Sequence, residues 1–236
     1  MSAPKLSHRE KIIEALMALA GEQPWQEISI SDVAAHAGLT LADFRDAFPS
    51  KGAALAGFQR MIDRKVLEGT DAALAQEPPR DRLFDVLMRH LDALAPYKDA
   101  LRNIRDWARR DPPAALALNG EMMNSMRFML EASGIDAEGP LGNVKLQGLV
   151  MAWLRILDVW FSDDDPQMDR TMAALDKELE RGGRLVQRLE DVQRLTAPLR
   201  NIAASIFSGS QTMRSRARER WDNHDTPRGA DRPIDV

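Results

Sequence analysis

Apolar residues recur at three- and four-residue spacing through successive segments of the chain, which is the pattern of helices that each bury one face. Proline and glycine interrupt the pattern, as in Pro78-Pro79 and in the glycine-containing run 134–142. The pattern predicts an all-α protein of about nine helices. The longer helices are expected over 7–20, 50–75, 80–94, 113–132, 143–161 and 166–195.

Two short helices joined by a turn are predicted between Ile28 and Phe58. Gly38 lies between them and can adopt the left-handed conformation that ends a helix. Each short helix is expected to begin with a capping box, in which a hydroxyl and a carboxylate three residues later bond to orphan backbone N–H groups. The cap pairs are Ser29 with Asp32 and Thr40 with Asp43, and the aromatic pair Phe44 and Phe48 would share one side of the second helix.

This order of turn glycine, cap, paired aromatics and Pro49-Ser50-Lys51 resembles the N-terminal domain of the TetR family of bacterial repressors, from Arg9 to about Phe58. The resemblance implies that the second short helix lies in the DNA major groove. It also implies a two-fold dimer whose all-helical C-terminal domain binds a small ligand. The DNA-binding residues that it implies are Thr40, Leu41, Ala42, Arg45 and Lys51.

Several polar positions of the second short helix depart from the pattern of that family. Asp43 stands where threonine is common, Arg45 where a phosphate-touching tyrosine is usual, and Ala47 where histidine or tyrosine is usual. Asp46 adds a carboxylate near the expected phosphates. Residues 1–65 hold eight basic and eight acidic side chains, so this part is formally neutral, whereas a tight DNA binder usually presents a basic face.

The predicted organisation has three parts. Residues 1–58 form the helix-turn-helix domain, 59–197 a helical ligand-binding and dimerisation domain, and 198–236 an amphipathic and basic tail with a disordered end. The tail is expected either to be a solvated extension or to contact an anionic surface, lipid headgroups or DNA phosphate. Its apolar positions are Leu199, Ile202, Ile206 and Phe207, and its arginines are Arg214, Arg216, Arg218 and Arg220.

Two clusters of apolar residues in the second domain carry predictions of binding. Methionine fills irregular space around variable ligands, so an apolar pocket is expected, with plain core packing as the alternative. Surplus apolar surface on the two last long helices predicts a homodimer formed by a four-helix bundle. The pocket residues are Met88, Trp107, Met122, Met126, Met129 and Trp153; the dimer residues are Met151, Leu154, Leu157, Trp160, Phe161, Leu175 and Leu179.

Composition narrows the chemistry further. The chain has no cysteine and a net charge of −4, and its histidines fall in no metal-ligand spacing. No nucleophile elbow, Walker loop or dinucleotide fingerprint is present, so neither an enzyme, a cofactor nor a metal is expected. Asp163, Asp164 and Asp165 are expected to cap the last long helix. The absence of a long apolar run or a signal-type start predicts a cytoplasmic protein.

Two functions remain open from the sequence. The first is a DNA-binding regulator, a repressor of the TetR type, that responds to a hydrophobic ligand. The second is a protein of the same fold that carries a lipid or isoprenoid without binding DNA. Residues 152–181 resemble the end of the TetR-fold accessory protein of coenzyme Q biosynthesis, which supports the second. A helical dimer whose apolar residues are all core is the plainest alternative.

Overall fold

The computed structural model describes residues 6–69, 76–139 and 141–189, and within them all regular structure is helical. The all-α prediction is therefore confirmed. The chain divides into two compact units, 1–183 and 184–236, and only 184–189 of the second are described. The first unit contains α1 (His8–Glu22), η1 (Trp25–Glu27), α2 (Ile30–His36), α3 (Leu41–Ala47), α4 (Lys51–Glu68), α5 (Pro79–Leu94), η3 (Ala95–Tyr97), α6 (Lys98–Ala108), α7 (Pro112–Ala132), α8 (Gly142–Trp160) and helical residues 169–183.

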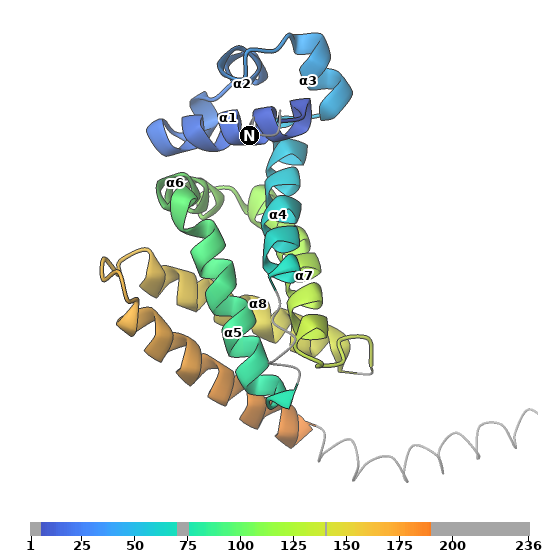
Figure 1. Cartoon of the computed structure of the whole chain (residues 1–236), viewed down its shortest axis with the longest axis vertical. Helices are drawn as coiled ribbons and strands as arrows, with labels where there is room; N and C mark the ends of the chain where they lie inside the picture. Colours follow the sequence, from blue (N-terminus) through green and yellow to red (C-terminus); the bar gives the residue numbers. More distant parts are fainter. Residues whose placement is uncertain (1–5, 70–75, 140, 190–236) are drawn as a thin grey trace, which may run out of the picture. The chain divides into compact units, whose positions relative to one another are not determined.

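The helix-turn-helix forms where the caps predict it, with α2 and α3 lying against α1 (Figure 1). Each of the three helices begins with a complete capping box, in which the hydroxyl accepts a backbone N–H and the carboxylate accepts another in return. Gly38 ends the turn after α2 with φ of +65°, a conformation that strains any residue with a Cβ atom. The cap pairs are Ser7 with Glu10, Ser29 with Asp32 and Thr40 with Asp43.

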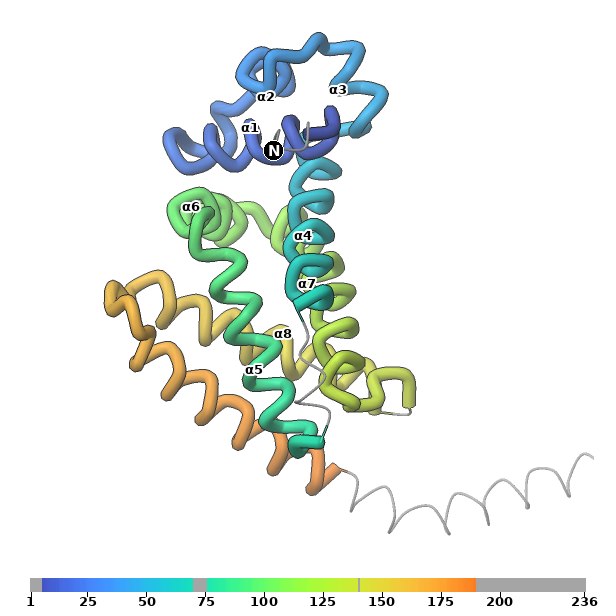
Figure 2. The backbone as a smooth tube through the Cα atoms, viewed as in Figure 1, coloured from blue at the N-terminus to red at the C-terminus, as the bar shows by residue number. Residues whose placement is uncertain are grey.

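Helix α4 connects the two halves of the first unit, because it contacts α1 at one end and α5 and α7 farther along (Figures 1 and 2). It begins after the predicted cap Ser50, whose hydroxyl accepts the N–H of Ala53. It ends at Glu68 with Gly69 as C-cap, so the predicted extension to residue 75 was wrong. Phe58, Ile62 and Val66 bury its inner face in one core with α1, α5 and α7.

The C-terminal helices have nearly the predicted bounds, with one late start. Helix α8 begins one residue before the predicted Asn143 and ends at Trp160. The next helix begins at 169 rather than 166, and Asp163 reaches forward to its first turn, where Oδ2 accepts the N–H and the hydroxyl of Thr171. Those bonds lower the pKa of Asp163. The aspartate run therefore supplies a cap, as predicted, from its first member.

None of the described helices has the length and apolar character to span a bilayer. The tail residues named above, from Leu199 to Arg220, lie outside the described part of the chain, as does the predicted boundary at 197. The remaining boundary, at residue 58, falls inside α4, so the two predicted domains share that helix.

Candidate functional site

The solvent-facing side of α3 is the candidate nucleic-acid interface. Phe44 points inward and is buried, while Leu41, Ala42 and Arg45 lie on the exposed side, Leu41 with 55% of its surface accessible. Within the described residues, no hydrogen bond or ion pair engages the guanidinium of Arg45. Arg45 is therefore available to an external partner, and Leu41 is a large apolar side chain held out in water beside it.

The side chains of Thr40 and Asp43 are occupied by the cap of α3. The Thr40 hydroxyl donates to Asp43 Oδ2 at 2.7 Å, and the backbone N–H of Asp43 donates back to the hydroxyl at 3.1 Å. The bond from the Thr40 hydroxyl and a second bond from the Thr40 backbone N–H to Asp43 Oδ2, at 2.9 Å, lower the pKa of Asp43, with a smaller contribution from the nearby His8 ring. The Asp43 charge is thus partly neutralised by the helix N-terminus rather than aimed at a partner.

Two cationic side chains of the helix-turn-helix region, Lys51 and Arg9, are bonded within the protein. Lys51 Nζ donates to the carbonyl oxygens of Trp25 and Ile28 at 2.5 and 2.6 Å and lies 4.4 Å from the centre of the Trp25 ring. Partial burial lowers the pKa of Lys51. Arg9 donates to the carbonyl oxygen of Ala47 at 2.6 Å and lies over the Phe48 ring. Both side chains fasten α3 and α4 to their neighbours, and a phosphate contact by Lys51 stays a prediction.

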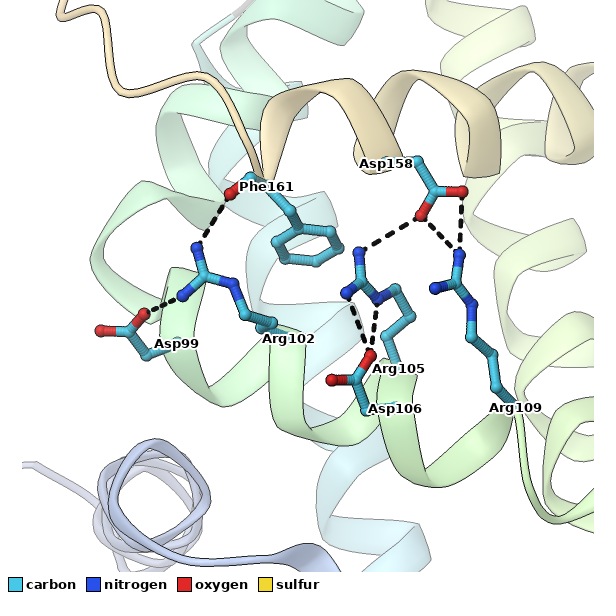
Figure 3. A network of polar contacts seen from close by, with 7 residues as sticks. All are labelled: Asp99, Arg102, Arg105, Asp106, Arg109, Asp158 and Phe161. Atoms are coloured by element: carbon cyan, nitrogen blue, oxygen red, sulfur yellow. Dashed lines mark hydrogen bonds and ion pairs between the residues drawn. The ribbon is translucent and has the colours of Figure 1, made fainter.

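Helix α6 joins the helix-turn-helix to the C-terminal half. Trp107 of α6 stacks on Trp25 of η1 with ring centres 5.1 Å apart, so Trp107 lies at this junction. On the other side of α6, arginines reach the end of α8 (Figure 3). Arg102 donates to the carbonyl of Phe161 at 2.8 Å, and Arg109 bonds to both carboxylate oxygens of Asp158. Helix α6 therefore touches both halves of the molecule.

A buried polar cluster lies among α4, α5 and α7. Asp63 Oδ1 accepts the hydroxyl of Ser125 at 2.6 Å and the amide of Gln59 at 3.0 Å. The same Gln59 nitrogen lies 3.4 Å from Nε2 of His90, whose ring packs against Trp153 with centres 5.1 Å apart. Burial lowers the pKa of His90 to about 4 and raises that of Asp63. The imidazole is therefore neutral at pH 7.

The predicted pocket residues are divided between this cluster and the α6 junction. Met126 and Met129 are buried in α7, and Trp153 contacts His90 directly. Met88 and Met122 are partly buried against the same core. Sequence reasoning missed Gln59, Asp63 and Ser125, because isolated polar residues in amphipathic helices look like surface positions.

The predicted dimer residues also fall into two groups. Met151 and Leu154 of α8 are exposed by 47% and 39%, and Leu157 is partly exposed. The other four are buried within a single chain and keep at most 7% of their surface exposed, so their place in a dimer interface stays a prediction. These four are Trp160, Phe161, Leu175 and Leu179. Among the described residues, no group of three or more acidic or histidine side chains is placed to hold a metal ion.

Comparison with known proteins finds sequence relatives that match only part of the chain. No protein-family model matches the chain. The nucleoid occlusion factor SlmA of Shewanella pealeana is 24% identical over 122 residues, which cover 52% of this chain and 55% of the relative. The same protein from Shewanella halifaxensis matches equally well. The chain thus spans about half the length of the curated relatives it matches.

Solved structures match over a larger share of the chain. A TetR transcriptional regulator from Nitrosomonas europaea superimposes with a TM-score of 0.61 at 19% identity, covering 74% of this chain and 97% of that one. A TetR transcriptional regulator from Rhodococcus sp. RHA1 gives 0.52 at 20% identity, covering 74% and 95%. The chain therefore has the TetR-family fold, as the resemblance of its helix-turn-helix predicted.

Proposed function

We propose that this chain is a TetR-type transcriptional regulator, a repressor that binds duplex DNA through α3 and responds to a hydrophobic ligand. The observation that carries the proposal is the capped, rigidly seated α3 with an unengaged Arg45 on its exposed face. An exposed arginine can donate two parallel bonds to a guanine edge or bind a phosphate oxygen. Leu41 beside it can contact a thymine methyl group.

The charges on and around α3 determine the DNA affinity that we expect. Arg45 is opposed by Asp46, which is exposed on the same helix, whereas Asp43 is held in the cap. Lys51 and Arg9 are bonded internally. DNA affinity should therefore be moderate, and it should depend on few phosphate contacts. Each neutralised phosphate contributes a slope of about −0.9 to the salt dependence of binding.

The proposed active form is a homodimer. Val144, Met151 and Leu154 lie exposed on α8, where burial against a second copy would remove apolar surface from water. A two-fold dimer would present two α3 helices, which must lie about one DNA turn, roughly 34 Å, apart to read one face of the duplex. A ligand that favours another spacing would release the DNA.

The test is a fluorescence-anisotropy titration with a duplex that the wild-type protein selects from a random library. Arg45→Ala should weaken binding by about 1–3 kcal/mol per half-site, and Asp46→Asn should strengthen it. Arg110→Ala is the matched control, because it removes an exposed arginine outside the helix-turn-helix. Failure of the wild type to select or bind any duplex at about 50 mM salt would contradict the proposal and favour the lipid-carrying alternative.

A further inference from the structure

His90 Nδ1 is one of the buried side-chain nitrogens of the described residues for which no hydrogen-bond partner is found. His90 is 1% exposed, and its Nδ1 accepts or donates no hydrogen bond. A buried polar group without a partner destabilises the fold, because water has been removed and nothing replaces it. An apolar side chain at this position of α5 would avoid that cost.

The bonds around the other ring nitrogen assign the proton of His90. Gln59 Nε2 lies 3.4 Å from His90 Nε2 and, closer, 3.0 Å from Asp63 Oδ1 and 3.1 Å from Ser125 Oγ. An amide nitrogen can only donate, so a hydrogen bond from Gln59 to the imidazole requires His90 Nε2 to be the acceptor. Asp63 Oδ1 is 3.9 Å from Nε2, too far for a hydrogen bond that would hold a proton there. The neutral imidazole therefore carries its proton on Nδ1. The unpartnered atom is an N–H donor.

The side chains around His90 determine how polar a ligand that reaches it can be. The Trp153 ring packs against the imidazole, and Met126 and Met129 of α7, the helix that also carries Ser125, are completely buried in the same core. These side chains are apolar and, in the case of methionine, readily change rotamer to admit a variable molecule. A molecule that reaches Nδ1 must therefore be largely apolar.

Charge argues against an anionic ligand, and hydrogen bonding argues against an ammonium ligand. The carboxyl of Asp63 lies in the same cluster, so an anion approaching His90 would be repelled when Asp63 is ionised. The same carboxylate would attract an ammonium ion, but an ammonium group has no acceptor to offer and would leave the Nδ1 donor unpaired. What the site lacks is a neutral acceptor.

We propose that Gln59, Asp63, His90 and Ser125 form the anchor of the effector site, and that the effector is an uncharged, largely apolar molecule whose carbonyl oxygen accepts the His90 Nδ1 proton. Ser125 and Asp63 hold Gln59, and Gln59 holds the tautomer of His90. This inference rests on the proposed function, since it names the chemical class of the ligand to which the regulator responds.

The test compares three probes with one carbon skeleton: 4-phenyl-2-butanone, butylbenzene and the 4-phenylbutan-2-aminium ion. Affinities are measured by isothermal titration calorimetry on the full chain. The ketone should bind the wild type about tenfold more tightly than butylbenzene, the value of one hydrogen bond to a buried donor. In His90→Phe, which keeps a ring of similar size, the ketone and butylbenzene should bind alike. Ser133→Ala is the control, because it removes a buried hydroxyl elsewhere in the core.

Nitrogen-15 NMR of the wild-type histidines keeps the test decisive if His90→Phe does not fold. The His90 signals should show the proton on Nδ1, and the ketone should shift that nitrogen more than butylbenzene does. Equal affinity of the ketone and butylbenzene for the wild type, tightest binding by the ammonium ion, no binding of the ketone at millimolar concentration, or a proton on Nε2 would each overturn the proposal.

The two proposals fail separately. DNA binding is measured without any probe, and probe binding is measured without DNA. A protein that binds the ketone through His90 and binds no duplex would refute the regulator and leave the effector site standing. A protein that binds DNA but binds all three probes alike would refute the effector site and leave the regulator standing.

Discussion

Replacing Lys51 with Met distinguishes a structural lysine from a DNA-binding one. In the structure its ammonium group donates to two backbone carbonyls, those of Trp25 and Ile28, and lies over the Trp25 ring. These contacts fasten the start of α4 to the η1 segment, which also stacks on Trp107 of α6. Methionine keeps the length of the side chain and removes both the charge and the donors.

The expected loss follows from the type of bond. A hydrogen bond that involves a charged group contributes about 1.5–3 kcal/mol, and an exposed cation–π contact about 0.5–1 kcal/mol. Lys51 is half-exposed, so water can replace part of these bonds in the variant. We therefore expect a loss of about 2 kcal/mol in the free energy of unfolding. For a chain of this size that lowers Tm by roughly 4–8 °C.

Two assays on one set of variants check this expectation. Thermal unfolding followed by circular dichroism should show the fall in Tm for Lys51→Met and little change for Lys65→Met. Lys65 is exposed on the same helix, so its replacement removes the same charge. The salt dependence of DNA binding should keep its slope in Lys51→Met, because no phosphate contact is lost.

The opposite pattern would refute the reasoning. If Lys51→Met leaves Tm unchanged while the slope of log K against log salt falls by about 0.9, then the lysine neutralises a phosphate. In that case the two carbonyl bonds contribute nothing measurable, and Lys51 returns to the DNA-binding face on which the sequence placed it.

Three more outcomes are expected. The folded-state pKa of Asp43 is lowered by its bonds to Thr40, so the stability from this cap is present above the unfolded pKa of about 3.9 and is lost as pH falls through the lower folded value; an NMR titration of the carboxyl checks this. Gly57→Ala should cost about 1–3 kcal/mol, measured by urea unfolding, because its Cβ would lie 2.8 Å from the buried Phe48 ring. Met151→Lys combined with Leu154→Lys should give a monomeric mass in light scattering, whereas a dimer of unchanged stability would place the interface elsewhere.

The elements that the sequence predicts well are those that a few neighbouring residues determine. A capping box is complete within four residues, so Thr40 and Asp43 predict the start of α3 without information from the rest of the chain. The positive φ of Gly38 is similarly local. The end of α4 was mispredicted because the prediction followed the apolar spacing past Glu68 and passed over Gly69, the glycine that forms the C-cap.

The partners of a long side chain can lie far away in the sequence, so its role cannot be predicted from its sequence neighbours. Lys51 follows the cap of α4, where a cation at the surface would suit a phosphate, yet its carbonyl partners lie 23 and 26 residues earlier. The same holds for the effector site. Ser125 and Asp63 are separated by 62 residues, and only the packing of α4 against α7 brings them within 2.6 Å. Each residue alone resembles a solvated position on an amphipathic helix. Gln59, Asp63 and Ser125 form the proposed ligand anchor only because the fold brings all three together beside the buried His90.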